Sequence, residues 1–200
     1  RKMIIIVNPQ SPIDAFVADP KTSEFPSVYY IDRVSHRINL NIYENYNEGI
    51  ANLINPKELN EKDKDEALLL WKRIALEECL EYFSYQMDKV GFNFNPGDKT
   101  ITVLEDLLEH FSTSQIYGII FRSIANATKW YQESQVSKKH AANSVIGGCQ
   151  RYGERAIIGK WELTKYNRIA DCPQSMLSEF FFNRVAGIGD LGFHMPPVSL

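Results

Sequence analysis

The feature that most constrains the fold of this 200-residue chain is the segment 115–133, where most side chains are apolar or small. The polar side chains recur at steps of three and four, with Gly118 in line: Gln115, Arg122, Asn126, Lys129 and Glu133. That spacing is typical of an α-helix with one narrow polar stripe. A helix that is apolar around most of its circumference belongs at the centre of a bundle, so the segment predicts a helical core.

Residues 60–90 predict a long helix. Asn60 is suited to cap its first turn, acidic side chains follow at the positive end of the helix dipole, and Gly91 ends it. One face carries the side chains expected in the core: Leu68, Trp71, Ala75, Cys79, Tyr82 and Phe83. We interpret a carboxylate cluster on this helix as a solvated outer face, because no His accompanies it: Glu77, Glu78 and Glu81.

Three more helices are predicted from their starts. Thr102 and Glu105 match a capping box, which predicts a helix over residues 102–111. Ser112 or Ser114 caps the polar-striped helix, and Ser137 caps a helix over 138–158. A last helix begins with Pro173 at a first helical position and runs to about residue 186, with these core side chains: Met176, Leu177, Phe180, Phe181 and Val185.

The helix over 138–158 has a polar stripe of its own: His140, Asn143, Gly147, Gln150 or Arg151, and Glu154. If it packs antiparallel to the segment 115–133, the two stripes face each other. They then form either a binding groove or an internal hydrogen-bonded network, because polar groups in a core must be satisfied. Glycine is unfavourable inside a helix, so Gly147 and Gly148 indicate that another backbone or a ligand comes close there.

Residues 1–59 predict an extended arm with a β-hairpin, packed on a helical domain over residues 60–200. Four prolines between residues 9 and 26 exclude a long regular element. The run 3–7 is β-branched, and the runs 28–31 and 38–43 form the hairpin, the second with clean alternation. The expected fold class is therefore mainly α: a bundle of about four to five helices with an N-terminal arm and a small β-hairpin.

Charge is divided unevenly along the chain. Residues 1–112 hold 12 Lys/Arg and 19 Asp/Glu, a net charge of -7, whereas residues 113–200 hold 10 and 6, a net charge of +4. Such an asymmetry favours either mutual packing of an acidic and a basic part or an anionic partner.

The cysteines and the hydropathy of the chain indicate where in the cell the protein is expected. Cys79, Cys149 and Cys172 are widely spaced and form no metal-binding pattern, so we expect reduced thiols, no cofactor and no metal. No run approaches the roughly 20 apolar residues of a membrane span. The sequence predicts a cytoplasmic protein without a membrane partner.

The leading functional hypothesis is a non-enzymatic module that binds a macromolecule, with nucleic acid favoured by the basic C-terminal half. The helices before and after residues 112–114 have the outline of a helix-turn-helix, although Ile119, Ile120 and Phe121 leave little surface to contact bases. The hydroxyls at the joint are suited to phosphate, and the polar stripes to phosphate or bases. The candidate nucleic-acid-binding residues are Ser112, Ser114, Gln115, Arg122, Asn126, Lys129, Lys138, Lys139, His140 and Arg151.

Two alternatives remain open. The chain is a protein-interaction or assembly domain if the aromatic side chains of the arm and hairpin contact another chain rather than the helical body: Tyr29, Tyr30, Tyr43 and Tyr46. It is a helical enzyme subunit if His140 acts with Glu154 in the polar stripe, although a lone His is more often structural.

Overall fold

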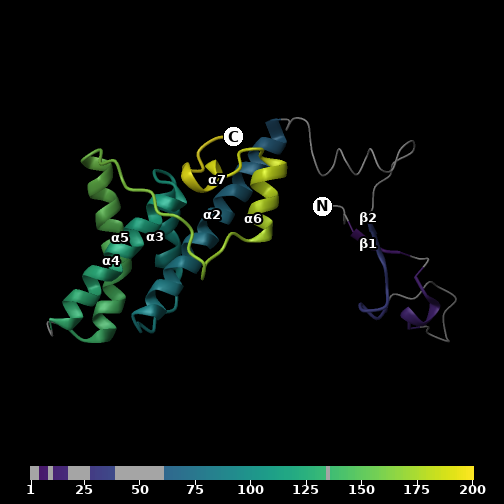
Figure 1. Cartoon of the computed structure of the whole chain (residues 1–200), viewed down its shortest axis with the longest axis horizontal. Helices are drawn as coiled ribbons and strands as arrows, with labels where there is room; N and C mark the ends of the chain where they lie inside the picture. The colour runs from purple at the N-terminus through teal and green to yellow at the C-terminus, as the bar shows by residue number, and fades with distance from the viewer. Residues whose placement is uncertain (1–4, 9–10, 18–27, 39–60, 134–135) are drawn as a thin grey trace. The chain divides into compact units, whose positions relative to one another are not determined.

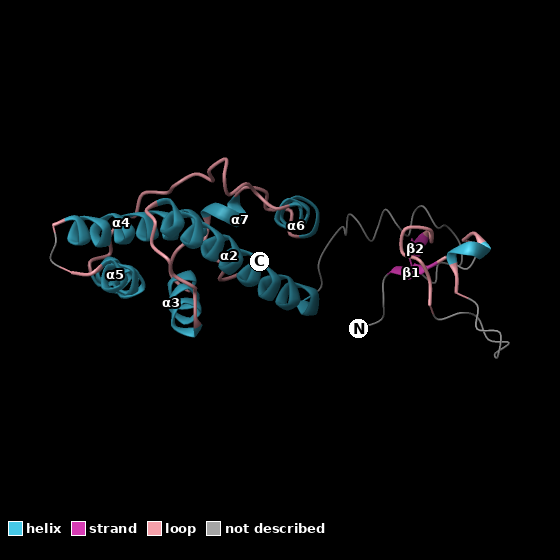
Figure 2. Cartoon of the chain, turned by 90° about the horizontal axis from the view of Figure 1, so that it is seen from below, coloured by secondary structure: helices cyan, strands magenta, loops and turns pink. Residues whose placement is uncertain are grey.

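A computed structural model describes residues 5–8, 11–17, 28–38, 61–133 and 136–200. The chain divides into two compact units, residues 1–54 and residues 55–200. In the part of the chain that the structure describes, the second unit is helical (Figures 1 and 2).

The N-terminal unit contains two short paired strands. Strand β1 (Ile5–Val7) pairs antiparallel with β2 (His36–Ile38), with Ile5 opposite Ile38. Between them lie a 3-10 turn, η1 (Ile13–Ala15), and an isolated bridge from Phe16 to Tyr29. Most of the second strand of the predicted hairpin, residues 39–43, lies outside the described residues, so that hairpin stays a prediction.

Helix α2 (Glu61–Lys89) confirms the predicted long helix. Its end follows from Gly91, which adopts a φ of 71°. The N–H of Phe92 donates to the Met87 carbonyl at 2.9 Å. This bond satisfies a carbonyl of the last turn that has no N–H partner within the helix. Trp71, Cys79 and Phe83 are buried along its apolar face, as expected.

Helix α3 (Asp98–Leu108) begins earlier than predicted. Its N-cap is Gly97, and Thr102 lies exposed inside the helix, so the prediction of a cap at Thr102 is wrong. The turn that ends at Gly97 already allows the first helical bonds, since the N–H groups of Thr100 and Ile101 both donate to the Gly97 carbonyl. Thr102 and Glu105 are simply neighbours one turn apart on the exposed face.

Two longer helices follow, with the predicted caps. Ser112 caps α4 (Thr113–Gln132) in a reciprocal capping box with Gln115. Ser137 caps α5 (Lys138–Ile158) by accepting from the His140 N–H. Together with α2 and α3, these helices form the body of the unit.

Helix α4 is the central helix of this body, as its sequence predicted. It contacts α2, α3, α5 and α7, and lies alongside α5 in Figure 1. Most of its apolar side chains are buried, among them Ile116, Ile120 and Ile124, but Phe121 and Tyr131 are exposed. Tyr117 stacks on Tyr82 of α2 with ring centroids 3.8 Å apart, which joins the two helices through their aromatic faces.

The C-terminal segment differs from the prediction. Helix α6 (Met176–Phe180) is capped by Ser175, not begun by Pro173, and continues as a π-helix, η2 (Phe181–Val185), before the short α7 (Leu191–His194). Three side chains expected in the core are exposed, by 84%, 58% and 46%: Met176, Leu177 and Phe180. They are exposed because this helix turns Ser178, Phe181 and Phe182 toward the body instead.

Trp71 holds this segment on α2. Its indole N–H donates to the Gly192 carbonyl at 2.9 Å, and its ring meets Phe182 edge to face at 6.0 Å. Both contacts are buried, so they attach residues near the C-terminus to the first half of α2.

Glu78 corrects the interpretation of the carboxylate cluster as solvated. Glu77 and Glu81 are exposed, but Glu78 is buried. Its carboxylate accepts two bonds of 3.0 Å from Arg168 and one of 2.8 Å from the Ser178 hydroxyl. The pattern within α2 could not reveal this, because the groups that satisfy Glu78 come from residues 90 and 100 positions later.

Candidate functional site

The candidate site lies between α4 and α5, which form an antiparallel pair. Trp130 near the end of α4 meets His140 at the start of α5, with ring centroids 5.4 Å apart. Toward the other end, a Cβ on Gly148 would lie 3.4 Å from the Cβ of Ser123. The helices are therefore in ordinary van der Waals contact at Gly148, and the nearest backbone atom of α4, the Ser123 Cα, would lie 4.0 Å from that Cβ. The close backbone approach predicted for this glycine is not found, and a hollow lies beside it.

That hollow, the basic groove, has a volume of about 320 Å³. Its walls carry two arginines, two aromatic side chains and one amide among small residues. None of the residues lining it is acidic. The groove is lined by Ser123, Asn126, Ala127, Trp130, Ser144, Gly148, Arg151, Tyr152 and Arg155.

A smaller hollow of about 50 Å³ continues from the basic groove past Tyr152, which lines both. Arg122 lines this second hollow and lies over the Tyr152 ring, with its guanidinium carbon 5.8 Å from the ring centroid. Its far wall is Tyr166, packed so closely that a Cβ on Gly118 would be 3.0 Å from the ring. Tyr152 thus shares one hollow with Arg151 and Arg155 and the other with Arg122 and Glu162.

The structure brings together only part of the predicted site. Asn126 and Arg151 line the basic groove, and Arg122 borders it. Gly147, predicted with Gly148 to mark a close approach, meets nothing but the Arg151 side chain.

The predicted role of the joint before α4 is corrected by its burial. Ser112 and Ser114 are completely buried, and their hydroxyls hydrogen-bond to each other at 2.9 Å. Gln115 closes the capping box and donates to the Leu163 carbonyl at 3.4 Å. Ser112 and Ser114 cannot reach a phosphate, whereas Gln115 is half-buried and lines the second hollow. Most of the first half of α4 is too covered to enter a DNA groove, so the helix-turn-helix outline has no binding surface there.

The remaining predicted residues lie outside the basic groove. Lys129 faces Glu133 at 3.8 Å, and Lys138 and Lys139 are exposed in the first turn of α5. His140 packs against Trp130 and stands about 21 Å along the α5 axis from Glu154. The proposed acid–base pairing of His140 with Glu154 is therefore wrong.

Sequence reasoning missed Trp130, Tyr152 and Arg155 as site residues. A signal existed for Arg155, because it follows Arg151 by four residues and so shares its helix face. Among the described residues, no ion pair involves Arg122, Arg151 or Arg155. Their charges are consequently available to an anionic ligand.

The rest of the described chain offers little for covalent or metal chemistry. Burial raises the pKa of the Cys149 thiol to about 11 and also raises the pKa of Cys79, which keeps both protonated near neutral pH. The described residues contain no cluster of three or more metal-ligating side chains. No helix within the same residues is long and apolar enough to cross a membrane.

No protein-family model, curated protein or solved structure matches the chain.

Proposed function

We propose that the helical unit binds single-stranded nucleic acid in the basic groove. The observation that carries the proposal is the combination of Arg151 and Arg155 with Tyr152 and Trp130 around one hollow that no acidic side chain lines. Proteins that bind single strands combine a positively charged groove with aromatic platforms in this way.

Each kind of side chain has a distinct role in this proposal. Arg151 and Arg155 hold backbone phosphates by charge-assisted hydrogen bonds. Arg122 extends the cationic surface past Tyr152 toward the second hollow. Tyr152 and Trp130 supply faces or edges for bases, and the Asn126 amide can donate to and accept from a base edge.

A single strand fits better than a duplex because the surface is concave. Reading a duplex in its major groove requires a projecting helix or ribbon. Helix α4, the best candidate for such a helix, is covered along its first half by the rest of the body. A strand with splayed bases can instead enter the hollow between α4 and α5.

Fluorescence anisotropy with a labelled oligouridylate, an oligothymidylate and a duplex of equal length tests the proposal at low salt. We expect both single strands to bind more tightly than the duplex. Arg151→Ala and Arg155→Ala should each weaken binding roughly tenfold, about 1.4 kcal/mol, with little effect on the thermal midpoint. Tyr152→Ala should cost about 1–3 kcal/mol of binding free energy.

Arg184→Ala is the matched control, because Arg184 is an exposed arginine of η2 that does not line the groove. It removes the same charge and should leave binding nearly unchanged. Absence of binding to every oligonucleotide at low salt, or an equal loss in the Arg184 variant, contradicts the proposal.

Protein interaction is a second candidate function, favoured by exposed apolar side chains. Met176, Leu177 and Phe180 are exposed on α6, and Tyr29 and Tyr30 are 41% and 49% exposed in the N-terminal unit. Large exposed apolar surfaces are typical of contacts with other proteins. A molar mass that rises with concentration, and falls back with Leu177→Ser and Phe180→Ser, would support it.

The cytoplasmic location belongs to the same proposal. It is supported by the three cysteines, which are all free and buried, since disulfides are rare in the reducing cytosol.

A further inference from the structure

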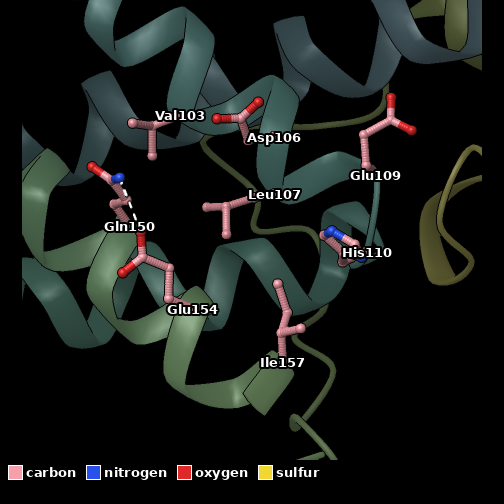
Figure 3. Close-up of a pocket in the computed structure, with 8 residues that line it drawn as sticks. All are labelled: Val103, Asp106, Leu107, Glu109, His110, Gln150, Glu154 and Ile157. Carbon is pink, nitrogen blue, oxygen red and sulfur yellow. Dashed lines mark hydrogen bonds between the residues drawn. The ribbon is translucent and has the colours of Figure 1, made fainter.

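A second groove lies between α3 and α5 (Figure 3). Its α5 residues, Gln150, Glu154 and Ile157, differ from those that line the basic groove. This acidic groove has a volume of about 250 Å³. Figure 3 shows Leu107 between residues of the two helices, with carboxylates around it. The groove is lined by Val103, Asp106, Leu107, Glu109, His110, Gln150, Glu154 and Ile157.

The floor of the acidic groove is apolar. Val103 and Leu107 are almost completely buried, and Leu107 packs directly on Gly153 of α5, where any Cβ would collide with it. Ile157 stands at the edge with 42% of its surface exposed. Covering such a side chain is favourable by about 25 cal/mol per Å² of apolar surface removed from water.

The rim of the acidic groove is negative. Asp106 and Glu154 belong to the lining, which contains no Lys or Arg. Glu109 already forms an ion pair with Lys72 at 2.6 Å. Glu154 accepts a hydrogen bond of 3.0 Å from the Gln150 amide, which is uncharged and therefore does not neutralise the carboxylate. The last turns of both α3 and α5 border the groove, so their C-terminal dipole ends add negative potential.

We propose that the acidic groove docks a basic amphipathic helix of a partner protein. One apolar side chain of that helix covers Leu107 and Ile157, and a Lys or Arg one turn away lies near Asp106 and Glu154. Charge complementarity selects this occupant: a nucleic acid or an anionic membrane would be repelled, and a purely apolar helix would leave the carboxylates desolvated and unpaired. In helix-in-groove recognition, the bound helix places its anchoring side chains three or four residues apart, which is one helical turn.

The test measures binding of the whole chain to a labelled peptide of about 15 residues, made of Leu and Lys with leucines along one helical face. Asp106→Lys with Glu154→Lys should weaken binding at least tenfold at low salt. Ile157→Ser should weaken it about threefold or more. Both should leave the circular dichroism spectrum intact, because all three side chains are exposed.

Glu105→Lys with Glu81→Lys is the matched control for charge. Both side chains are exposed and neither lines the acidic groove, although Glu105 lies beside Asp106 in sequence. We expect a smaller loss from this control than from the Asp106 and Glu154 pair. Equal losses, or equal binding of a scrambled peptide of the same composition, would show a non-specific acidic surface and overturn the proposal.

A second copy of this chain is the competing occupant. If the acidic groove were covered by another copy, the chain would be a dimer in light scattering, and the Asp106 and Glu154 reversal would make it monomeric. That result would also overturn the proposal. None of these outcomes depends on oligonucleotide binding, so the two proposals fail independently.

Discussion

The basic groove and the acidic groove are both formed with α5, yet they have opposite charge and different floors. Arg151 and Arg155 line the basic groove, whereas Gln150, Glu154 and Ile157 line the acidic groove. One helix therefore separates two charges by the direction in which successive side chains leave it. A net charge of -3 conceals this arrangement completely.

The floors differ in what they contribute to stability. The acidic groove rests on Val103 and Leu107, which belong to the core of the unit. The basic groove rests on small residues, Ser123, Ala127 and Gly148, and its large side chains stand on the walls. Mutations of Val103 or Leu107 in the floor of the acidic groove should therefore change folding, and mutations of the walls of the basic groove should change binding.

The largest expected effect is that of Leu107→Ala. Removing this buried side chain should lower the free energy of unfolding by about 2–5 kcal/mol, because it leaves a cavity between α3 and α5. Tyr152→Ala, on the half-buried wall of the basic groove, should lower it by less while reducing oligonucleotide binding. Urea unfolding monitored by circular dichroism compares the two, and equal stability losses would contradict the distinction between the floors.

A smaller effect is expected at two of the three glycines of α5. Gly153→Ala places a methyl group against Leu107, and overpacking of this kind costs about 1–3 kcal/mol. Gly148→Ala meets only an ordinary contact with Ser123 at 3.4 Å and gains up to roughly 1 kcal/mol of helix propensity. We expect a lower thermal midpoint for the first variant and an unchanged or higher one for the second. The reverse order would show that α4 and α5, not α3 and α5, are the tightly packed pair.

The smallest effect is expected for Lys129→Ala, which tests where the basic groove ends. Lys129 already faces Glu133 and does not line the groove, so oligonucleotide binding should weaken less than about twofold. Its stability change should stay within about 0.5 kcal/mol. A loss as large as that of Arg155→Ala, measured by the same anisotropy assay, would extend the binding surface along α4.

The helical body could be predicted because its signals are local. Asn60, Gly91, Ser112 and Ser137 lie within a residue or two of the helix ends they mark. The error at Thr102 arose because a capping pattern and a pair of exposed neighbours have the same spacing. Local patterns therefore predicted the presence of each helix more accurately than its first residue.

Burial that depends on distant residues could not be predicted. Glu78 looked solvated because its partners, Arg168 and Ser178, come from an irregular segment and a five-residue helix. Met176 and Phe180 looked buried because their apolar character says nothing about which face of a short helix meets the body. Only part of the lining of the basic groove was predicted: the polar stripes included Asn126 and Arg151, but the sequence analysis did not identify Trp130 and Tyr152 as lining residues.

The bond from Trp71 to Gly192 has a consequence for the order of events during synthesis. The two residues are 121 positions apart, which a ribosome covers in about 6–24 s at roughly 5–20 residues per second. Over that interval, the sequence that forms α3, α4 and α5 is made before Phe182 and Gly192. The nascent chain therefore carries the Trp71 indole without its ring and carbonyl partners until the last residues of the unit have been added.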